Sequence, residues 1–307
     1  MDHRVLIVSP VRNEAEHIER VARAMAEQTR PPAAWIVADD GSDDGTLELL
    51  RALEAEIPFM RVVSTAPAPG TEDSPDRLAQ AAAPRTFNAG LATADWREFT
   101  HVGKLDGDVE LPPDYFEELL ARFDADPELG IACGDLVEQF EDGPRRIPIP
   151  PHHVHGALKL YTRACFEAIG GVQTRLGWDT IDETYARMRG FRTRSFRDIV
   201  AQHHRHWGSA QGTLRGRARH GECAYIVHYG LGWVLLRSLK LSLARPPVVS
   251  GAAFVYGYLR AAVRSTPRVE DRDFRRHIRR ELRRRLLGPV RSRLSSPGRK
   301  FAAGRTV

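Results

Sequence analysis

The sequence contains little cysteine, and this scarcity excludes two classes of protein. Its three cysteines, Cys133, Cys165 and Cys223, are far apart in a chain of 307 residues. An odd number at such spacing provides neither a disulfide framework nor the clustered ligands of a structural zinc site. We therefore expect a reducing, cytoplasmic environment.

Long hydrophobic runs are also missing. The N-terminal segment MDHRVLIVSPVRNE returns to polar residues after an apolar run that is too short for a signal peptide or a membrane span. Two later apolar stretches, at 224–243 and 246–263, are interrupted by charged residues or by glycine and serine. They predict either a buried helical hairpin or a pair of helices in the membrane interface.

Neither of the common glycine-rich phosphate loops is present. The chain has no G-x-x-x-x-G-K-[ST] segment and no G-x-G-x-x-G segment. This excludes a P-loop and a Rossmann-type phosphate site.

Charge is unevenly distributed along the chain. The net charge is +5, yet residues 264–307 alone carry fourteen Arg, one Lys and four acidic residues, a net +11. The rest of the chain is therefore mildly acidic, at about −6. The overall composition, 42% hydrophobic and 28% charged, is typical of a soluble globular protein.

The first half of the chain alternates short apolar runs with amphipathic helical patterns, which predicts an α/β fold with a mostly parallel central sheet. The expected strands are 5–9, 35–38, 60–64, 99–105, 131–133 and 137–140. The expected helices are 13–25, one beginning near 46, 112–123 and one within 177–191, and a surface loop is expected at 66–84. The main domain would cover 1–212, followed by a helical segment at 213–263 and a basic arm at 264–307.

Polar segments follow three of these strands. They are SPVRNE after the first, DDGSDDG after the second and DGD after the fourth. Because the carboxyl ends of parallel strands meet at one edge of a sheet, where ligands bind, we expect these segments to form one site.

Several of these side chains have both a ligand role and a structural alternative. Asp39 or Asp40 would accept hydrogen bonds from a nucleotide base, whereas Ser42 to Asp44 are equally suited to cap the next helix. Arg12 would pair with a phosphate or lie solvated at the surface. Asn88, expected at a helix start, would cap that helix or contact the ligand.

The segment KLDGDVELPPD places Asp106 and Asp108 on either side of a glycine. An Asp-Gly segment is a common turn at the end of a strand. Its carboxylate oxygens also suit Mg²⁺ or Mn²⁺ bound together with a diphosphate. A metal there would neutralise the charge on a departing nucleoside diphosphate.

Taken together, SPVRNE, VADDGSDDGT, FNAGLA, LDGDVELPPDYFEEL, IGG and GWDTIDETYARMRGF resemble an inverting family-2 glycosyltransferase of the GT-A fold. The resemblance covers about residues 4–206. It implies a nucleotide-sugar donor, with UDP as the default nucleotide. It also implies that Asp106 and Asp108 form the metal-binding DXD motif, with Asp108 favoured as the direct ligand. The residues that it places near the base and ribose are Pro10, Arg12, Glu14 and Asp40.

An inverting transfer needs a carboxylate that takes the proton from the acceptor hydroxyl. In the family this base lies at the start of the helix after the GG turn, where this chain has Asp179, Asp182 and Glu183. The local sequence departs from the commoner Glu-Asp form, so the family motif can be aligned here in two ways that differ by three residues. We expect Asp182 to be the base and keep Asp179 as the alternative. Capping of the helix and interaction with its dipole are the structural alternatives for both.

The segment QHHRHWG at 202–208 offers a further metal ligand. The resemblance to some GT-A enzymes implies a histidine downstream of the base that completes the metal shell. His203 or His204 would do so, because neutral imidazole binds Mn²⁺ well. A purely structural role is the alternative.

The basic arm has Phe274, Ile278 and Leu282 at helical spacing among arginines. This pattern predicts an amphipathic helix on an anionic membrane surface, with a solvated basic helix as the alternative. No motif supports nucleic-acid binding. We expect peripheral attachment to the inner face of the cell membrane, consistent with a lipid-linked acceptor.

These observations predict a metal-dependent inverting glycosyltransferase. It would move a sugar to a hydroxyl of a glycan, glycolipid or small molecule in cell-envelope or polysaccharide biosynthesis, with Mn²⁺ or Mg²⁺. One rival is a sugar-nucleotidyltransferase, whose usual glycine-rich and basic N-terminal loop is absent from SPVRNEAE. The other is a catalytically silent, membrane-associated scaffold of the same fold.

Overall fold

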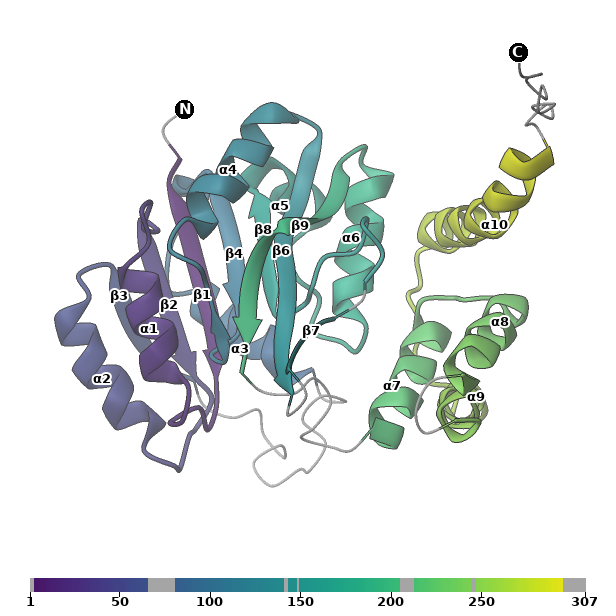
Figure 1. Ribbon diagram of the computed structural model, residues 1–307, viewed down its shortest axis with the longest axis horizontal. Coiled ribbons are helices and arrows are strands. Elements are labelled where there is room, and N and C mark those ends of the chain that lie inside the picture. Colours follow the sequence, from purple (N-terminus) through teal and green to yellow (C-terminus); the bar gives the residue numbers. More distant parts are fainter. Residues whose placement is uncertain are drawn as a thin grey trace, which may run out of the picture.

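The computed structural model describes residues 3–65, 81–140, 143–147, 149–204, 213–243 and 247–294, with the side chains of all but 213 and 286–294. Its centre is a nine-stranded sheet in the order β3-β2-β1-β4-β8-β6-β9-β5, with β7 paired to β6 (Figure 1). Most of the loop expected at 66–84 and the end of the basic arm lie outside the described residues.

Parallel pairing brings the carboxyl ends of the first four strands to one edge of the sheet. These strands are β1 (Val5–Val11), β2 (Ala34–Asp39), β3 (Met60–Ser64) and β4 (His101–Leu105). In the register of β1 with β2, Val11 lies opposite Asp39, so the polar segments after both strands begin at the same level. The predicted meeting of three polar segments at one edge is confirmed.

The second half of the sheet is mixed. Its strands are β5 (Val109–Glu110), β6 (Leu129–Phe140), β7 (Gly143–Arg146), β8 (Leu158–Thr162) and β9 (Arg192–His203). β8 lies between β4 and β6 and runs antiparallel to both, whereas β6 and β9 are parallel. The expected parallel arrangement therefore describes the first four strands, and the later strands add antiparallel pairs.

The strands expected at 131–133 and 137–140 are parts of the single strand β6. Its register with β9 shifts between Gly134 and Asp135. A Cβ on Gly134 would lie 2.5 Å from the carbonyl oxygen of Ile199, so only glycine allows this close approach of two backbones. The glycine therefore marks an irregularity within one strand rather than its end.

Helices cover the sheet, and several begin later than their apolar pattern suggests. They are α1 (Ile18–Ala26), α2 (Thr46–Glu56), α3 (Ala82–Leu91), α4 (Tyr115–Ala125), α5 (Arg163–Ile169) and α6 (Trp178–Met188), with a short 3-10 turn η1 (Trp96–Glu98). α1 begins at Ile18 rather than at Asn13, because Asn13 adopts a φ of 54° and belongs to a loop.

Four further helices follow the sheet and lie beyond α6 (Figure 1). They are α7 (Thr213–Ile226), α8 (Leu231–Ser242), α9 (Val249–Val263) and α10 (Arg272–Leu294). The apolar stripe of α10, formed by Phe274, Ile278 and Leu282, is buried in a cluster with Ile181 of α6. Among the described residues, no helix is both long enough and apolar enough to cross a membrane.

Candidate active site

The segments after β1 and β2 are joined into one loop cluster at the edge of the sheet. The Arg12 guanidinium donates to the carbonyl oxygen of Asp40 at 3.1 Å. The Asn13 backbone N–H donates to the Ser42 hydroxyl at 3.0 Å, and its side-chain amide donates to Asp43 at 2.8 Å. Arg12 is therefore oriented by the neighbouring segment and half-buried at the site, in contrast to a solvated surface arginine.

The side chain of Asp39 lies at the centre of this loop cluster and accepts several of its hydrogen bonds. Its buried carboxylate accepts the backbone N–H groups of Gly41 at 3.1 Å and Ser42 at 3.2 Å, and also the Ser42 hydroxyl. The backbone N–H of Asp40 donates to the carbonyl of Val11 at 2.8 Å, which attaches the turn to β1. Both oxygens of Asp39 thus form the turn that presents Asp40 at the strand end.

The DGD segment packs directly on the segment after β1. A Cβ on Gly107 would lie 3.2 Å from Cγ of Glu14 and 3.3 Å from Cγ2 of Val11. These distances are tighter than an ordinary van der Waals contact, so a larger residue would push the two segments apart. The predicted donor-site residues Glu14, buried, and Pro10, half-buried, lie on this same edge.

Asp106 follows β4 and is paired with a lysine of that strand. The Lys104 ammonium contacts the Asp106 carboxylate and also donates to the carbonyl oxygen of Gly156 at 2.9 Å. Lys104 is buried, whereas about a third of the Asp106 side chain is exposed. Burial, together with the charge of Asp108, raises the pKa of Asp106 above its usual range although Lys104 opposes the shift.

Asp108 lies beside His203. Their Oδ2 and Nε2 atoms are 3.5 Å apart, and Nδ1 of the same histidine is 3.1 Å from Oε1 of Glu138. All three side chains are buried. Burial by itself would lower the pKa of His203, but the two carboxylates outweigh it and the pKa is raised.

His204 is the first residue after β9, and its side chain contacts other residues than Asp108. Its Nε2 lies 2.6 Å from Glu110 and its Nδ1 lies 3.1 Å from the Arg20 guanidinium, while its ring stacks on His17. Of the two predicted histidine ligands, the structure therefore brings His203 and not His204 to Asp108.

Asp108 and His203 together fit a divalent metal ion that uses few protein ligands. Neighbouring ligands of an octahedral ion at about 2.1 Å lie roughly 3 Å apart, close to the separation of Asp108 and His203. In the part of the chain that the structure describes, no three His, Cys, Asp or Glu side chains are grouped to hold a metal ion by themselves. Mg²⁺ commonly completes such a shell with water and substrate phosphate oxygens.

Asp182 is held inside the protein. Its two carboxylate oxygens each lie 2.9 Å from the Lys159 ammonium, and the Tyr161 hydroxyl donates to it at 2.5 Å. The Lys159 ammonium also lies 3.4 Å from the buried carboxylate of Glu183. Burial and the charge of Glu183 raise the pKa of Asp182 to about 6, although Lys159 and Tyr161 act in the opposite direction.

Asp179 is half-buried in the first turn of α6. Its Oδ2 is 3.7 Å from the position that a Cβ would take on Gly156, whose carbonyl accepts from Lys104. Asp179 thus lies across Gly156 from the Lys104–Asp106 pair. The Asp179 carbonyl accepts from Lys159 at 2.9 Å, so the buried lysine fixes the turn that carries Asp179.

Asn88 has a different place from the one expected. It is the seventh residue of α3, so it does not cap that helix. Its side-chain amide donates to the carbonyl oxygen of Val172 at 2.8 Å, which attaches α3 to the segment after the Gly-Gly turn.

The motifs did not identify the two buried lysines, Lys104 and Lys159. Both ammonium groups lie over the Trp178 ring, at 5.5 and 5.1 Å from its centre. The available signal was a lysine inside each of the apolar runs HVGKL and LKLYT. A lysine is seldom fully buried unless it is paired, so its presence in such a run indicates a buried carboxylate nearby.

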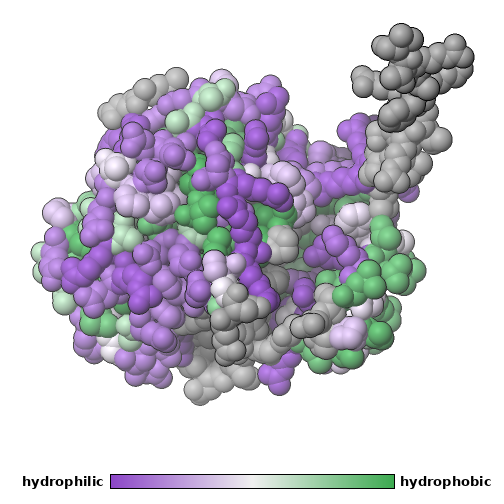
Figure 2. Space-filling model, in the orientation of Figure 1, coloured by the Kyte–Doolittle hydropathy of each residue, from purple (hydrophilic) through white to green (hydrophobic). Residues whose placement is uncertain are grey.

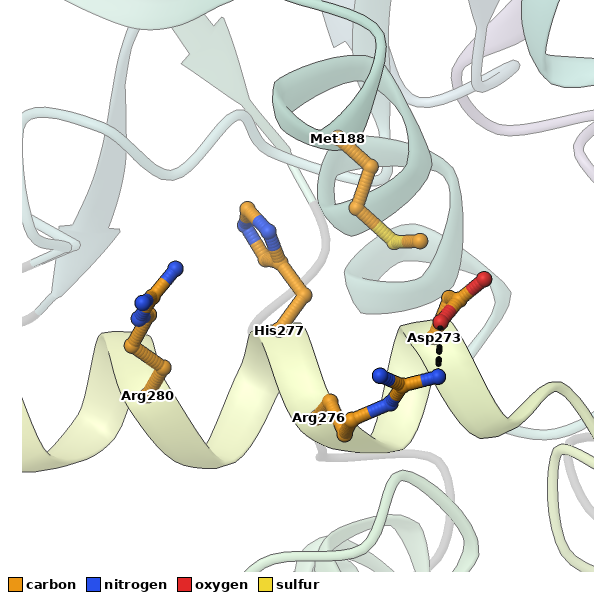
Figure 3. A pocket seen from close by; sticks show the side chains of 5 residues that line it. All are labelled: Met188, Asp273, Arg276, His277 and Arg280. Carbon is orange, nitrogen blue, oxygen red and sulfur yellow. Dashed lines mark ion pairs between the residues drawn. The ribbon is translucent and has the colours of Figure 1, made fainter.

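A groove of about 460 Å³ lies elsewhere, between the end of α6 and α10 (Figure 3). It is lined by Met188, Asp273, Arg276, His277 and Arg280. Arg276 is 2.7 Å from Asp273 on its own helix. Met188 is the last residue of α6 and lies about 13 Å along the helix axis from Asp179 in its first turn. This groove is therefore separate from the site formed by the segments after β1, β2 and β4, which we call the strand-end site.

The fold is that of the GT-A glycosyltransferases. One similar structure is the mannosyltransferase PcManGT of Pyrobaculum calidifontis in complex with GDP-Man and Mn²⁺, with a TM-score of 0.57 and 19% identity over 95% of this chain and 83% of that one. Another is residues 1–349 of S. aureus TarS in complex with UDP-GlcNAc, with a TM-score of 0.53 and 14% identity over 86% of this chain and 73% of that one.

The amino-acid sequence matches the same class. The model of glycosyl transferase family 2 matches residues 6–67. The succinoglycan biosynthesis protein ExoA of Rhizobium meliloti (strain 1021) is 36% identical over 120 residues, which are 38% of this chain and 31% of that protein. The alignment therefore spans about a third of that relative. Over the residues that they cover, these matches agree with the predicted resemblance to the family-2 glycosyltransferases.

Proposed function

We propose that this protein transfers a sugar from a nucleoside-diphosphate donor to a hydroxyl acceptor, with inversion at the anomeric carbon. The observation that carries the proposal is the convergence of the segments after β1, β2 and β4 on one edge, beside the first turn of α6. ExoA is named a succinoglycan biosynthesis protein, which supports an acceptor in polysaccharide or envelope synthesis.

The donor nucleotide would bind along the segments after β1 and β2. Asp40 would accept from the base, and Arg12, oriented by the Asp40 carbonyl, would face the phosphates. Asp39 would act indirectly, by forming the turn. UDP is the default nucleotide, while GDP in the PcManGT complex keeps a guanine donor as the second candidate.

Asp108 and His203 would hold a divalent ion at the donor diphosphate, with Asp106 beside them. Such an ion supplies positive charge against the departing nucleoside diphosphate. Glu138, on the other nitrogen of His203, would orient its ring, as carboxylates commonly do for metal-binding histidines.

We favour Asp179 over Asp182 as the general base, the reverse of the order expected from the motif. Asp182 is 1% exposed and fully engaged by Lys159 and Tyr161, which leaves no room for an acceptor hydroxyl. Asp179 would take the proton of the acceptor hydroxyl as that oxygen bonds to the anomeric carbon. The bond from this carbon to the diphosphate breaks, and the nucleoside diphosphate leaves with the electron pair.

A thermal-shift screen tests donor binding. UDP, GDP and dTDP and their sugars are compared with and without Mn²⁺, and one of them should raise the melting temperature only when Mn²⁺ is present. Stabilisation by a nucleoside triphosphate and a sugar phosphate, with pyrophosphate release, would identify a sugar-nucleotidyltransferase instead. Absence of any Mn²⁺-dependent nucleotide binding would favour a silent scaffold.

A further inference from the structure

The helices α8 and α9 expose an unusual number of large apolar side chains. We call this surface the hairpin face. It consists of Leu231, Leu235, Leu236, Leu239, Leu243, Val248, Val249, Tyr256, Leu259 and Val263. Exposure ranges from 47% for Val249 to 86% for Val263. Figure 2 shows a green area at the edge of the molecule where Figure 1 places α8. Contiguous apolar surface of this kind marks an interaction site.

The helices of the same unit have a small core around Val234, Phe254 and Tyr258, and they approach one another most closely at glycines. A Cβ on Gly257 would lie 1.8 Å from the carbonyl oxygen of Ala218, and one on Gly221 would lie 1.9 Å from that of Phe254. A Cβ on Gly251 would lie 2.2 Å from the Ser242 hydroxyl. Helices that pack through glycine and serine while leucine points outward have the arrangement typical of an apolar solvent, because in water the leucines would be inside.

The charges around the hairpin face favour an anionic lipid surface over other binding partners. Residues 223–269 contain no Asp or Glu, and they carry six cations. Arg237 and Lys240 are exposed between the leucines of α8, and Arg264 is exposed just after α9. Such cations are attracted to anionic lipid headgroups. Two copies of the chain joined by this face would instead bring like charges together without an acid from either hairpin.

Within residues 264–285, whose side chains the structure describes, the basic arm does not offer an equivalent surface. Phe274 and Ile278 of α10 are almost completely buried against α6 and its neighbours, so the apolar stripe that predicted membrane contact is covered by the chain itself. Only arginines remain on the exposed side of that helix in the range 275–284.

We propose that the hairpin face docks the protein on an anionic lipid bilayer, with α8 and α9 lying in the headgroup and upper acyl region. At 12 and 15 residues, these helices are shorter than the roughly 20 residues needed to span. Helices of this kind lie in the plane of the interface and bury their apolar face about 5–10 Å into the boundary between headgroups and acyl chains.

Docking there would place the strand-end site near the membrane. α7 precedes the hairpin, and its Cys223 lies 3.7 Å from the position of a Cβ on Gly177, the residue before α6 and two before Asp179. The value of this placement for a lipid-linked acceptor rests on the proposed function. The docking itself does not, and it is measured without donor or acceptor.

The experiment is co-sedimentation of the full chain with vesicles of phosphatidylcholine, alone or mixed with phosphatidylglycerol. The wild type should bind the anionic vesicles more tightly. The triple variant Leu235→Gln, Leu239→Gln and Leu259→Gln should lower the partition coefficient by about tenfold or more. It should keep the wild-type melting temperature, because the three side chains are exposed.

A matched variant changes only the exposed arginines of α10, as Arg276→Gln, Arg283→Gln and Arg284→Gln. Its loss of vesicle binding should be smaller than that of the leucine variant. Wild-type binding by the leucine variant would overturn the proposal, as would a complete loss confined to the arginine variant. A wild-type dimer that the leucine variant dissociates, with no vesicle binding by either, would identify the face as a contact between copies and also overturn it.

Discussion

Lys159 and Asp182 form an ion pair that is closed to solvent. The ammonium lies 2.9 Å from both carboxylate oxygens, and the two side chains are 0% and 1% exposed. The lysine comes from β8 and the aspartate from α6, so the pair joins the sheet to the helix that carries Asp179. Breaking such a pair leaves a buried charge without its partner.

The first prediction concerns stability. Asp182→Asn should lower the free energy of unfolding by about 3–5 kcal/mol, because Lys159 would remain buried with less compensation. Urea unfolding followed by circular dichroism measures the change. Asp198→Asn is the matched control: it removes an exposed ion pair with Arg122 and should cost less than about 1 kcal/mol. Equal effects of the two variants would show that the buried pair contributes little.

Asp179→Asn should behave in the opposite way. Its stability and its affinity for the donor should remain close to wild type, because the side chain is half-buried at the end of a helix. Turnover should fall by roughly 10²–10⁴-fold if this carboxylate takes the acceptor proton. Steady-state kinetics and donor titration separate the two effects. A fully active Asp179→Asn enzyme would remove the residue from the base assignment.

Two adjacent histidines provide a test of the metal site. His203→Gln should weaken Mn²⁺-dependent donor binding by about 10–100-fold, because His203 lies 3.5 Å from Asp108. His204→Gln should leave donor binding nearly unchanged, because His204 faces Glu110. Calorimetric titration of the donor with and without Mn²⁺ measures both. Similar losses in both variants would argue against His203 as a specific ligand.

Acid should destabilise the protein between pH 6.5 and 4. Burial lowers the pKa of His101 from 6.5 to about 4, an effect increased by the nearby charge of His3. The unfolded chain therefore binds more protons than the folded one in this window, and the unfolding free energy falls as pH falls. His101 alone accounts for at most about 1.4 kcal/mol per pH unit.

The measurement is urea unfolding at a series of pH values for the wild type and His101→Phe. The variant should show a shallower decline, because it cannot take up the proton on unfolding. His155 and His220, whose pKa values burial also lowers to about 4, should preserve part of the slope. An identical slope in both proteins would mean that His101 does not titrate as described.

The parallel half of the fold could be predicted from local patterns. The strand expected at 60–64 is β3, and the other three early strands agree within a few residues. β8 and β9 were not predicted. β8 has Lys159 at its second position, and the sequence RTRSFRDIVAQH of β9 contains several charges, so neither is a plain apolar run. Their charges are accommodated by partners far along the chain, which a local pattern does not contain.

Contacts between residues far apart in the sequence also limited how much of the site could be predicted. The motifs located the strand ends and both aspartates of α6, but not which aspartate is buried. That depends on Lys159 and Tyr161 of β8, more than 20 residues away. Likewise, the choice between His203 and His204 follows from their contacts, because His203 lies beside Asp108 whereas His204 lies beside Glu110. In both cases the sequence left open which of two neighbouring side chains points to a given partner. Contacts with residues far away in the sequence determine the answer.

The central proposal for this protein is glycosyl transfer from a nucleoside-diphosphate sugar at the strand-end site. The most direct measurement is the release of nucleoside diphosphate from UDP-, GDP- and dTDP-sugars by the purified protein with Mn²⁺, with Asp108→Asn as the control. We expect release from at least one donor, and this release should be lost when the metal is chelated and reduced about 100-fold or more in the variant. Release of pyrophosphate, or release of nucleoside diphosphate that is unchanged in Asp108→Asn, would contradict it.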